Sequence, residues 1–157
     1  MLGLVLALAA PAAAQDDELM RKEVVGGLRL GATAASVVKA LGPPAQKGKI
    51  DQRGSDGDYV QTWKFPARGL ELTMRAAKRA GAQTIDAIVV NAPSTLKTSR
   101  GIGIGSTLAE LQRAYGADRN PEDSTADSFV AGSTFGGVIF QLEAGRVRSI
   151  FVGAAAE

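Results

Sequence analysis

The stretch Gly27-Leu-Arg-Leu-Gly-Ala-Thr-Ala-Ala-Ser-Val-Val-Lys-Ala-Leu-Gly42 has a second version, Gly101-Ile-Gly-Ile-Gly-Ser-Thr-Leu-Ala-Glu-Leu-Gln-Arg-Ala-Tyr-Gly116, 74 residues later. Six positions are identical in the two stretches, and several others keep their apolar or basic character. Similarity at a fixed offset is typical of a duplicated structural unit. The sequence therefore predicts two copies of one unit.

Each copy has the pattern of a short extended piece that leads into a helix of about two turns. Thr33 and Thr107 stand at the expected N-caps, where a hydroxyl accepts a backbone N–H. Glu110, three residues after Thr107, completes a capping box. Gly42 and Gly116 are expected to end the helices in the left-handed conformation.

After each helix the hydrophobic period changes from 3.6 to 2, which indicates β-strands. The expected strands are 46–51, 59–65, 70–75 and 84–91 in the first copy, and 128–131, 138–142 and 147–152 in the second. One helix on a small sheet buries little surface, whereas two units joined into one sheet bury enough. We expect an α+β fold in which two tandem helix-plus-antiparallel-strand repeats form one sheet with the helices on one face.

The amino-terminal segment has the pattern of an export signal. An apolar run from Leu2 to Ala10 is broken by Pro11, and small residues precede a cleavage site after Ala14. The run is shorter than the roughly 20 residues of a membrane span, and a buried amino-terminal helix is the alternative. We expect a soluble periplasmic or secreted product, without a lipid anchor because no Cys follows the signal.

The 157 residues fit one domain, or two small halves that share a core. The expected organisation is a signal peptide (1–14), an N-terminal extension (15–26), repeat 1 (27–91), a linker (92–100), repeat 2 (101–152) and a tail (153–157).

Composition excludes several kinds of chemistry. The chain has no Cys and no His, which removes disulfides, thiol nucleophiles, Cys/His zinc sites and histidine-based acid–base catalysis. A net charge of +2 is too small to indicate a nucleic-acid partner. No spacing brings carboxylates or a Ser/Lys pair together on one element. We therefore expect a protein that is not an enzyme and needs no cofactor or metal.

Three polar motifs have competing interpretations. The glycines of Gly101-Ile-Gly-Ile-Gly105 could cradle phosphate, but the motif lacks the Rossmann and P-loop patterns, and a structural turn is favoured. Asp51, Asp56 and Asp58 could hold calcium, but their spacing is not that of an EF-hand, and a hairpin turn is favoured. The acidic run Glu122-Asp123 with Asp127 is interpreted as a polar loop.

The pattern of glycine, alternating apolar residues, glycine and threonine before a short helix, followed by antiparallel strands, resembles the SmpA/OmlA type of outer-membrane assembly lipoprotein. As a tandem pair it resembles the β-lactamase inhibitory protein. The resemblance covers about residues 27–152. It implies a helical element packed on an antiparallel sheet whose concave face meets a partner protein. The chain lacks the cysteines of both groups, and no individual inhibitory residue is carried over.

The leading functional hypothesis is a module that binds another protein through the open sheet face, in envelope assembly or in inhibition of a secreted enzyme. The candidate contact residues are Tyr59, Trp63, Arg75, Lys78 and Arg79, because aromatic residues and Arg dominate protein-binding hot spots. For the aromatic residues a place in the core is the favoured alternative, and for the cations a solvated turn is favoured. A domain that binds a small ligand and an unrecognised carboxylate hydrolase are the alternatives.

The signal-peptide hypothesis predicts that the product isolated from the host begins at or near Gln15. Amino-terminal sequencing of that product is the measurement. A mature protein that retains Met1 would contradict the expected localisation.

Overall fold

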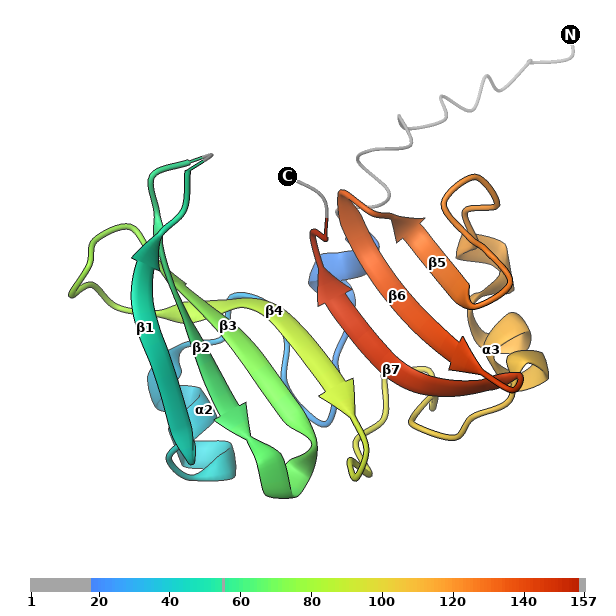
Figure 1. Cartoon of the computed structure of the whole chain (residues 1–157), viewed down its shortest axis with the longest axis horizontal. Helices are drawn as coiled ribbons and strands as arrows, with labels where there is room; N and C mark the ends of the chain where they lie inside the picture. The colour runs from blue at the N-terminus through green and yellow to red at the C-terminus, as the bar shows by residue number, and fades with distance from the viewer. Residues whose placement is uncertain (1–17, 55, 156–157) are drawn as a thin grey trace, which may run out of the picture.

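The structure, a computed structural model, describes residues 18–54 and 56–155 (Figure 1). The expected signal peptide therefore lies outside the described residues. The elements in chain order are α2 (Ala34–Leu41), β1 (Gln46–Gln52), β2 (Tyr59–Phe65), the 3-10 turn η1 (Pro66–Arg68), β3 (Leu70–Ala76), β4 (Thr84–Asn91), α3 (Leu108–Tyr115), the 3-10 turn η2 (Gly116–Asp118), β5 (Ser128–Ser133), β6 (Gly136–Glu143) and β7 (Arg146–Gly153). A helical turn at 18–22 precedes them.

The seven strands form one antiparallel sheet in the order β1-β2-β3-β4-β7-β6-β5. The α+β class and the antiparallel sheet are thus confirmed. The strands from before and after residue 100 meet where β4 pairs with β7, and this pairing joins Ile88–Asn91 to Ser149–Val152. We call this four-residue ladder the seam.

Beyond the four-residue ladder, the edges of β4 and β7 that face the seam are covered by other segments. The residues just before α2 cover β4, and the residues just before α3 cover β7. Gly31 N donates to Ile85 O at 2.8 Å, and Ile85 N donates to Ala32 O at 2.9 Å. These bonds satisfy the edge of β4 before the seam begins. Unpaired strand edges invite aggregation, so this cover protects the middle of the sheet.

The same arrangement occurs at β7. Gly105 N donates to Val147 O at 2.7 Å, and Val147 N donates to Ser106 O at 2.8 Å. Each pre-helix segment is therefore fixed to a seam strand, which places the following helix against the sheet.

The predicted N-caps are confirmed. The hydroxyl of Thr33 accepts from Ser36 N, and Thr107 with Glu110 forms a complete capping box. Gly42 ends α2 with φ +81°. The prediction for Gly116 is wrong: its φ is −59° because the chain continues from α3 into η2 instead of reversing.

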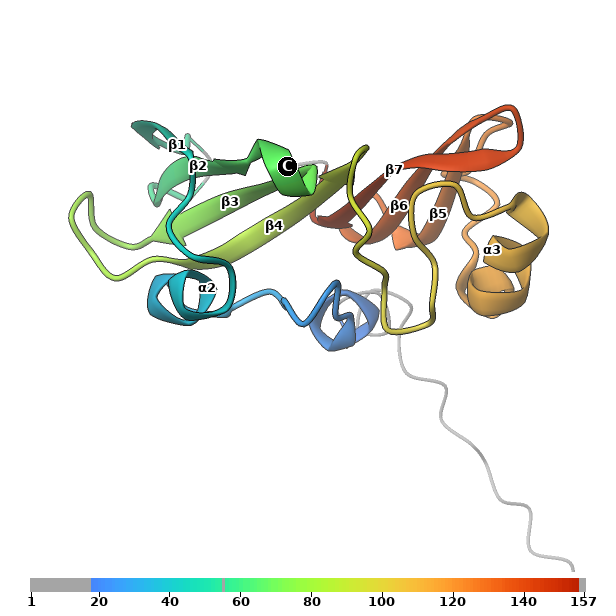
Figure 2. The same cartoon turned by 90° about the horizontal axis from the view of Figure 1, so that it is seen from below.

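The core lies between the sheet and the helices, all of which lie on one side of the sheet (Figure 2). Strand register aligns one row of side chains that crosses the sheet and is at most 2% exposed: Trp63, Leu72, Ile88, Val152, Val138 and Ala131. The helices add Val37, Leu111 and Tyr115 to this core. One continuous apolar layer therefore spans the seam.

A buried carboxylate ties the amino-terminal segment to the region around α3. Glu23 is 3% exposed, and its Oε1 accepts from Ser99 N at 2.9 Å and from Ser99 Oγ at 2.7 Å. Its Oε2 accepts from the hydroxyl of Tyr115 at 2.8 Å. Buried charges are tolerated when they are hydrogen-bonded in this way. Residues 23–32 thus connect β4, which Gly31 and Ala32 bind, to Ser99 and to Tyr115 of α3.

Replacement of the buried Trp63 should destabilise the fold. Trp63→Ala removes a large core side chain that is 2% exposed, and we expect a loss of about 3–5 kcal/mol in the free energy of unfolding. Denaturant unfolding measures this loss. The control is Lys64→Ala at the neighbouring exposed position, where we expect a change within about 0.5 kcal/mol. Equal effects of the two substitutions would contradict the assignment of Trp63 to the core.

Tyr115 should make stability fall at alkaline pH. Burial raises the pKa of its phenol above the ordinary value of about 10. Above that pH the unfolded chain releases the proton while the folded chain keeps it, so the free energy of unfolding decreases as pH rises. Between about pH 9 and pH 11, the free energy of unfolding should decrease more steeply with pH for the native chain than for Tyr115→Phe. Denaturant unfolding at each pH measures it. Parallel curves would refute this role for Tyr115.

Candidate functional site

The α-helices leave the opposite face of the sheet without a helical cover (Figure 2). Register again defines a row across all seven strands on this side: Gln46, Lys64, Glu71, Val89, Phe151, Ile139 and Val130. Ile139 and Val130, at the β6–β5 end of the row, are buried at 8% and 1% exposure, so the row reaches solvent only from β1 to the seam. We call it the open-face row. Side chains alternate between the two faces of a strand. From β2 onward across the sheet, each residue of this row is therefore next in sequence to a residue of the buried row, as Lys64 is to Trp63.

The open-face row is apolar at the seam and charged over β2 and β3. Val89 and Phe151 are directly paired across the seam, and both are half-buried. Toward β1, Lys64 Nζ lies 3.2 Å from Glu71 Oε2. An apolar centre beside polar groups is the usual composition of a protein-binding surface.

Arg75 lies on the same face and joins an ionic network. Its guanidinium contacts Asp58, lies 3.2 Å from Asp56 Oδ2 and 3.6 Å from Asp86 Oδ1. The hydrogen bond to Asp58 is the main interaction that raises the pKa of Arg75. Arg53 contacts Asp86 and lies 3.6 Å from Asp56. The aspartates of the β1–β2 turn therefore bind guanidiniums.

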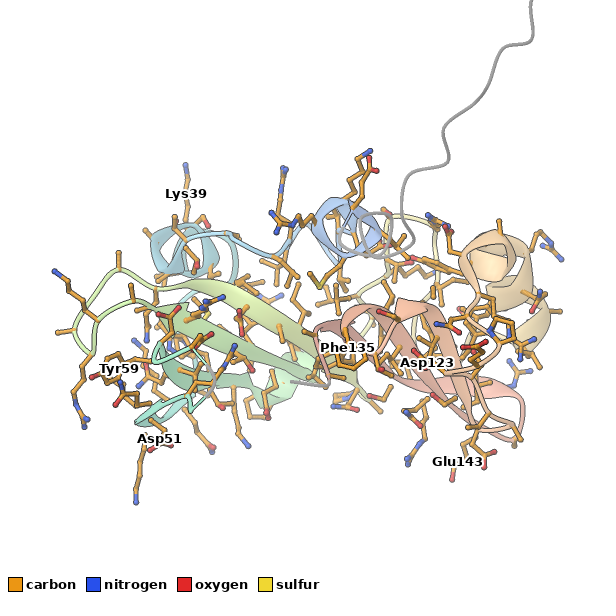
Figure 3. All side chains as sticks on the ribbon, turned by 90° about the horizontal axis from the view of Figure 1, so that it is seen from above. Lys39, Asp51, Tyr59, Asp123, Phe135 and Glu143 are labelled. Atoms are coloured by element: carbon orange, nitrogen blue, oxygen red, sulfur yellow. The ribbon has the colours of Figure 1, made fainter. Side chains whose placement is uncertain are left out.

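A groove opens where the sheet ends beyond the seam. Its volume is about 440 Å³, and it is lined by Met20, Arg21, Leu30, Gly31, Arg53, Arg75, Thr84, Ile85, Asp86, Phe135 and Ala154. We call it the seam groove. The helical turn at 18–22, β3, β4 and the β5–β6 turn all contribute to it. Phe135, which is labelled in Figure 3, is 71% exposed at its rim.

The β5–β6 turn that carries Phe135 is held from two sides. Thr134 N donates to Asp123 Oδ2 at 3.0 Å. Thr134 O accepts from Ala155 N at 2.8 Å. The carboxylate of Asp123, in the predicted polar loop, thus has a structural role, because it holds the β5–β6 turn in place.

The contact residues predicted from the sequence differ in how far they are exposed. Trp63 is buried on the helix side, so its prediction as an exposed contact residue is wrong: Trp63 is paired with Leu72, and the two side chains share the core face. Its Nε1 donates to Gln61 Oε1 at 3.1 Å. Tyr59 is half-buried, and Lys78 and Arg79 are exposed in the β3–β4 turn.

The glycines before α3 have structural roles in the turn that leads into this helix. Gly101 and Gly105 have φ of +81° and +87°, and a Cβ on Gly103 would lie 3.1 Å from Leu96 O.

Within residues 18–54 and 56–155, no three acidic side chains are grouped so as to hold a metal ion. In the same part of the chain, no helix is long and apolar enough to cross a bilayer.

Sequence reasoning missed Val89, Phe151 and Phe135. Val89 and Phe151 stand at alternate positions to the core residues Ile88, Val90, Ile150 and Val152, so their outward direction was visible as a period of 2. Their approach to each other depends on the pairing of β4 with β7, which no local pattern shows. Phe135 stands out only as an aromatic residue between the polar Thr134 and two glycines.

Comparisons with family models, with curated proteins and with solved structures found no match to the chain.

Proposed function

We propose that the chain is an exported, non-enzymatic module that binds another protein through the open face of its sheet. The observation that carries this proposal is the part of this face over β2, β3 and the seam that no described element covers. All helices of the described residues lie on the other side, and the exposed side presents the Val89–Phe151 pair beside the Lys64–Glu71 ion pair. Partly exposed aromatic and aliphatic groups near charged groups favour a protein partner.

We also propose that the sheet arose from two copies of one unit. The seam register supports this, because Val89 pairs with Phe151 while Ile88 pairs with Val152 and Val90 pairs with Ile150. If Ile88 and Ile150 are equivalent positions of the two copies, and Val90 and Val152 are another such pair, then Val89 is equivalent to Phe151. The ladder is then symmetric about the Val89–Phe151 pair. The pre-helix segments also bind β4 and β7 through equivalent atoms.

A register irregularity in each half is a further support. The β3–β4 pairing shifts between Thr73 and Met74, and the β6–β7 pairing shifts between Gln141 and Leu142. In both halves the extra residue belongs to the seam strand, as Asp86 or Arg148. A β-bulge re-aims the side chains around it and increases twist. Two bulges at equivalent places curve both halves of the sheet in the same way.

The resemblance to tandem inhibitory proteins supports the same kind of partner, although it assigns no residue. Arg75 remains a candidate contact because it lies on the open face at the edge of the seam groove. Lys78 and Arg79, in the turn after the same end of β3, are secondary candidates. Tyr59 shares the helix-side face of β2 with Trp63, so it is not part of the proposed open-face surface. Trp63 is not part of the proposed surface.

A photo-crosslinking experiment tests the proposed face. A photoreactive residue at position 89 reports on the open face, and one at position 39, on exposed α2, is the matched control (Figure 3). In the envelope of the host we expect a defined protein adduct from position 89 and none from position 39. Adducts from position 39 alone would contradict the proposal.

The partner identified in this way then permits a binding measurement. Phe151→Ala should weaken binding of the purified partner by about 1–2 kcal/mol, since truncation of a contacting aromatic residue commonly exceeds 1 kcal/mol. Leu108→Ala, on the helix side, should leave binding unchanged. The unfolding midpoint of each variant shows whether the effect is selective. A thermal shift with small metabolites, without any protein adduct, would favour the small-ligand alternative.

A further inference from the structure

A small apolar groove lies between the end of α2 and η1, at the end of β1 and β2 that is opposite the β1–β2 turn (Figure 1). Its volume is about 210 Å³, and its apolar lining includes Leu41, Pro43, Ala45, Phe65 and Ala67. Arg68 is its one charged lining residue in the described part of the chain. We call it the η1 groove, and it shares no lining residue with the seam groove.

The walls of the η1 groove are fixed before any ligand arrives. Phe65 is 5% exposed and belongs to the core. Gly69 N donates to Pro66 O at 3.0 Å and closes η1. Ala45 N donates to Lys64 O at 3.0 Å and holds the start of β1 against β2. A ligand therefore meets a preformed surface, as it does in most small-molecule sites.

The cations beside this groove have no carboxylate partner. Arg68 lines the groove and is exposed. Lys47 is paired with Trp63, two residues before Phe65, and its Nζ lies 4.1 Å from the centroid of the Trp63 ring. In the described part of the chain, neither Arg68 nor Lys47 forms an ion pair. Lys39, in the last turn of α2, offsets the negative end of that helix, which ends beside the groove.

The nearby carboxylates do not neutralise these cations. Asp56 and Asp58 lie in the β1–β2 turn, at the other end of β1 and β2, and both bind Arg75. Glu71 lies nearer, on β3, but its Oε2 is 3.2 Å from Lys64 Nζ. The η1 groove therefore combines an apolar lining with positive charge that is not neutralised, and this charge attracts an anionic ligand.

We propose that the η1 groove binds a small amphipathic carboxylate, with its apolar part in the groove and its carboxylate against Arg68, in the field of Lys47. The planar guanidinium offers paired N–H donors that match a carboxylate. The volume of about 210 Å³ lies below the roughly 300–1,000 Å³ of sites for drug-sized ligands, so a short chain or a single ring fits. This site is separate from the Val89–Phe151 surface and does not rest on the proposed function.

NMR titration of the isotope-labelled chain with octanoate tests the proposal. We expect saturable shifts of the backbone amides of Leu41, Ala45, Phe65 and Arg68. Acetate supplies the carboxylate alone and should give no saturable shift there, because it buries almost no apolar surface. Octylammonium has the same chain and the opposite charge, and its dissociation constant should be at least about fivefold higher, since one exposed charge pair contributes this much at its upper limit. Equal constants for octanoate and octylammonium, or no saturable octanoate shift at these amides, would overturn the proposal.

Two variants separate the contribution of the charge from that of the groove. Arg68→Gln should raise the dissociation constant of octanoate about fivefold. The matched control Arg113→Gln, which removes an exposed cation from α3, should leave it unchanged. Ala67→Trp places a bulky ring at the groove and should abolish the shifts, and its unfolding midpoint shows that it is folded. An unchanged constant for Arg68→Gln, or equal effects of Arg68→Gln and Arg113→Gln, would count against the site.

Discussion

The pairing of β4 with β7 is the constraint on which the rest of the structure depends. Only Ile88–Asn91 and Ser149–Val152 pair across the seam, yet their register decides which side chains of both halves face the helices. A shift of one residue would turn the apolar set of one half toward solvent. The continuous buried row from Trp63 to Ala131 therefore requires this register, and so does the opposite row that contains Val89 and Phe151.

The covered edges explain how so short a ladder can lie in the middle of a sheet. The pre-helix segments around Gly31 and Gly105 complete β4 and β7 beyond the seam, and they also determine where α2 and α3 begin. Glu23 links this system to Tyr115 and Ser99. Since these supports lie on the helix side, the opposite face over β2, β3 and the seam remains accessible for the protein contact that we propose.

Much of the fold was predictable because its signals are local. The period of 2 indicated each strand, and Thr33 and Thr107 marked the starts of the helices. Local patterns failed where a long-range contact decides the outcome. Gly116 continues into a 3-10 turn, and the side of Trp63 follows from its pairing with Leu72. The site was predicted less well, since the Val89–Phe151 pair and the seam groove exist only once strands distant in sequence meet.

Native-state hydrogen exchange at the seam tests the central claim, that the seven strands form one cooperative sheet joined at β4 and β7. Amides that donate across the ladder between Ile88–Asn91 and Ser149–Val152 should exchange only through global unfolding. Their exchange free energies should equal the free energy of unfolding measured with denaturant. Seam amides that exchange through local opening, while the interiors of both halves stay protected, would show that the halves are separate units and contradict the account.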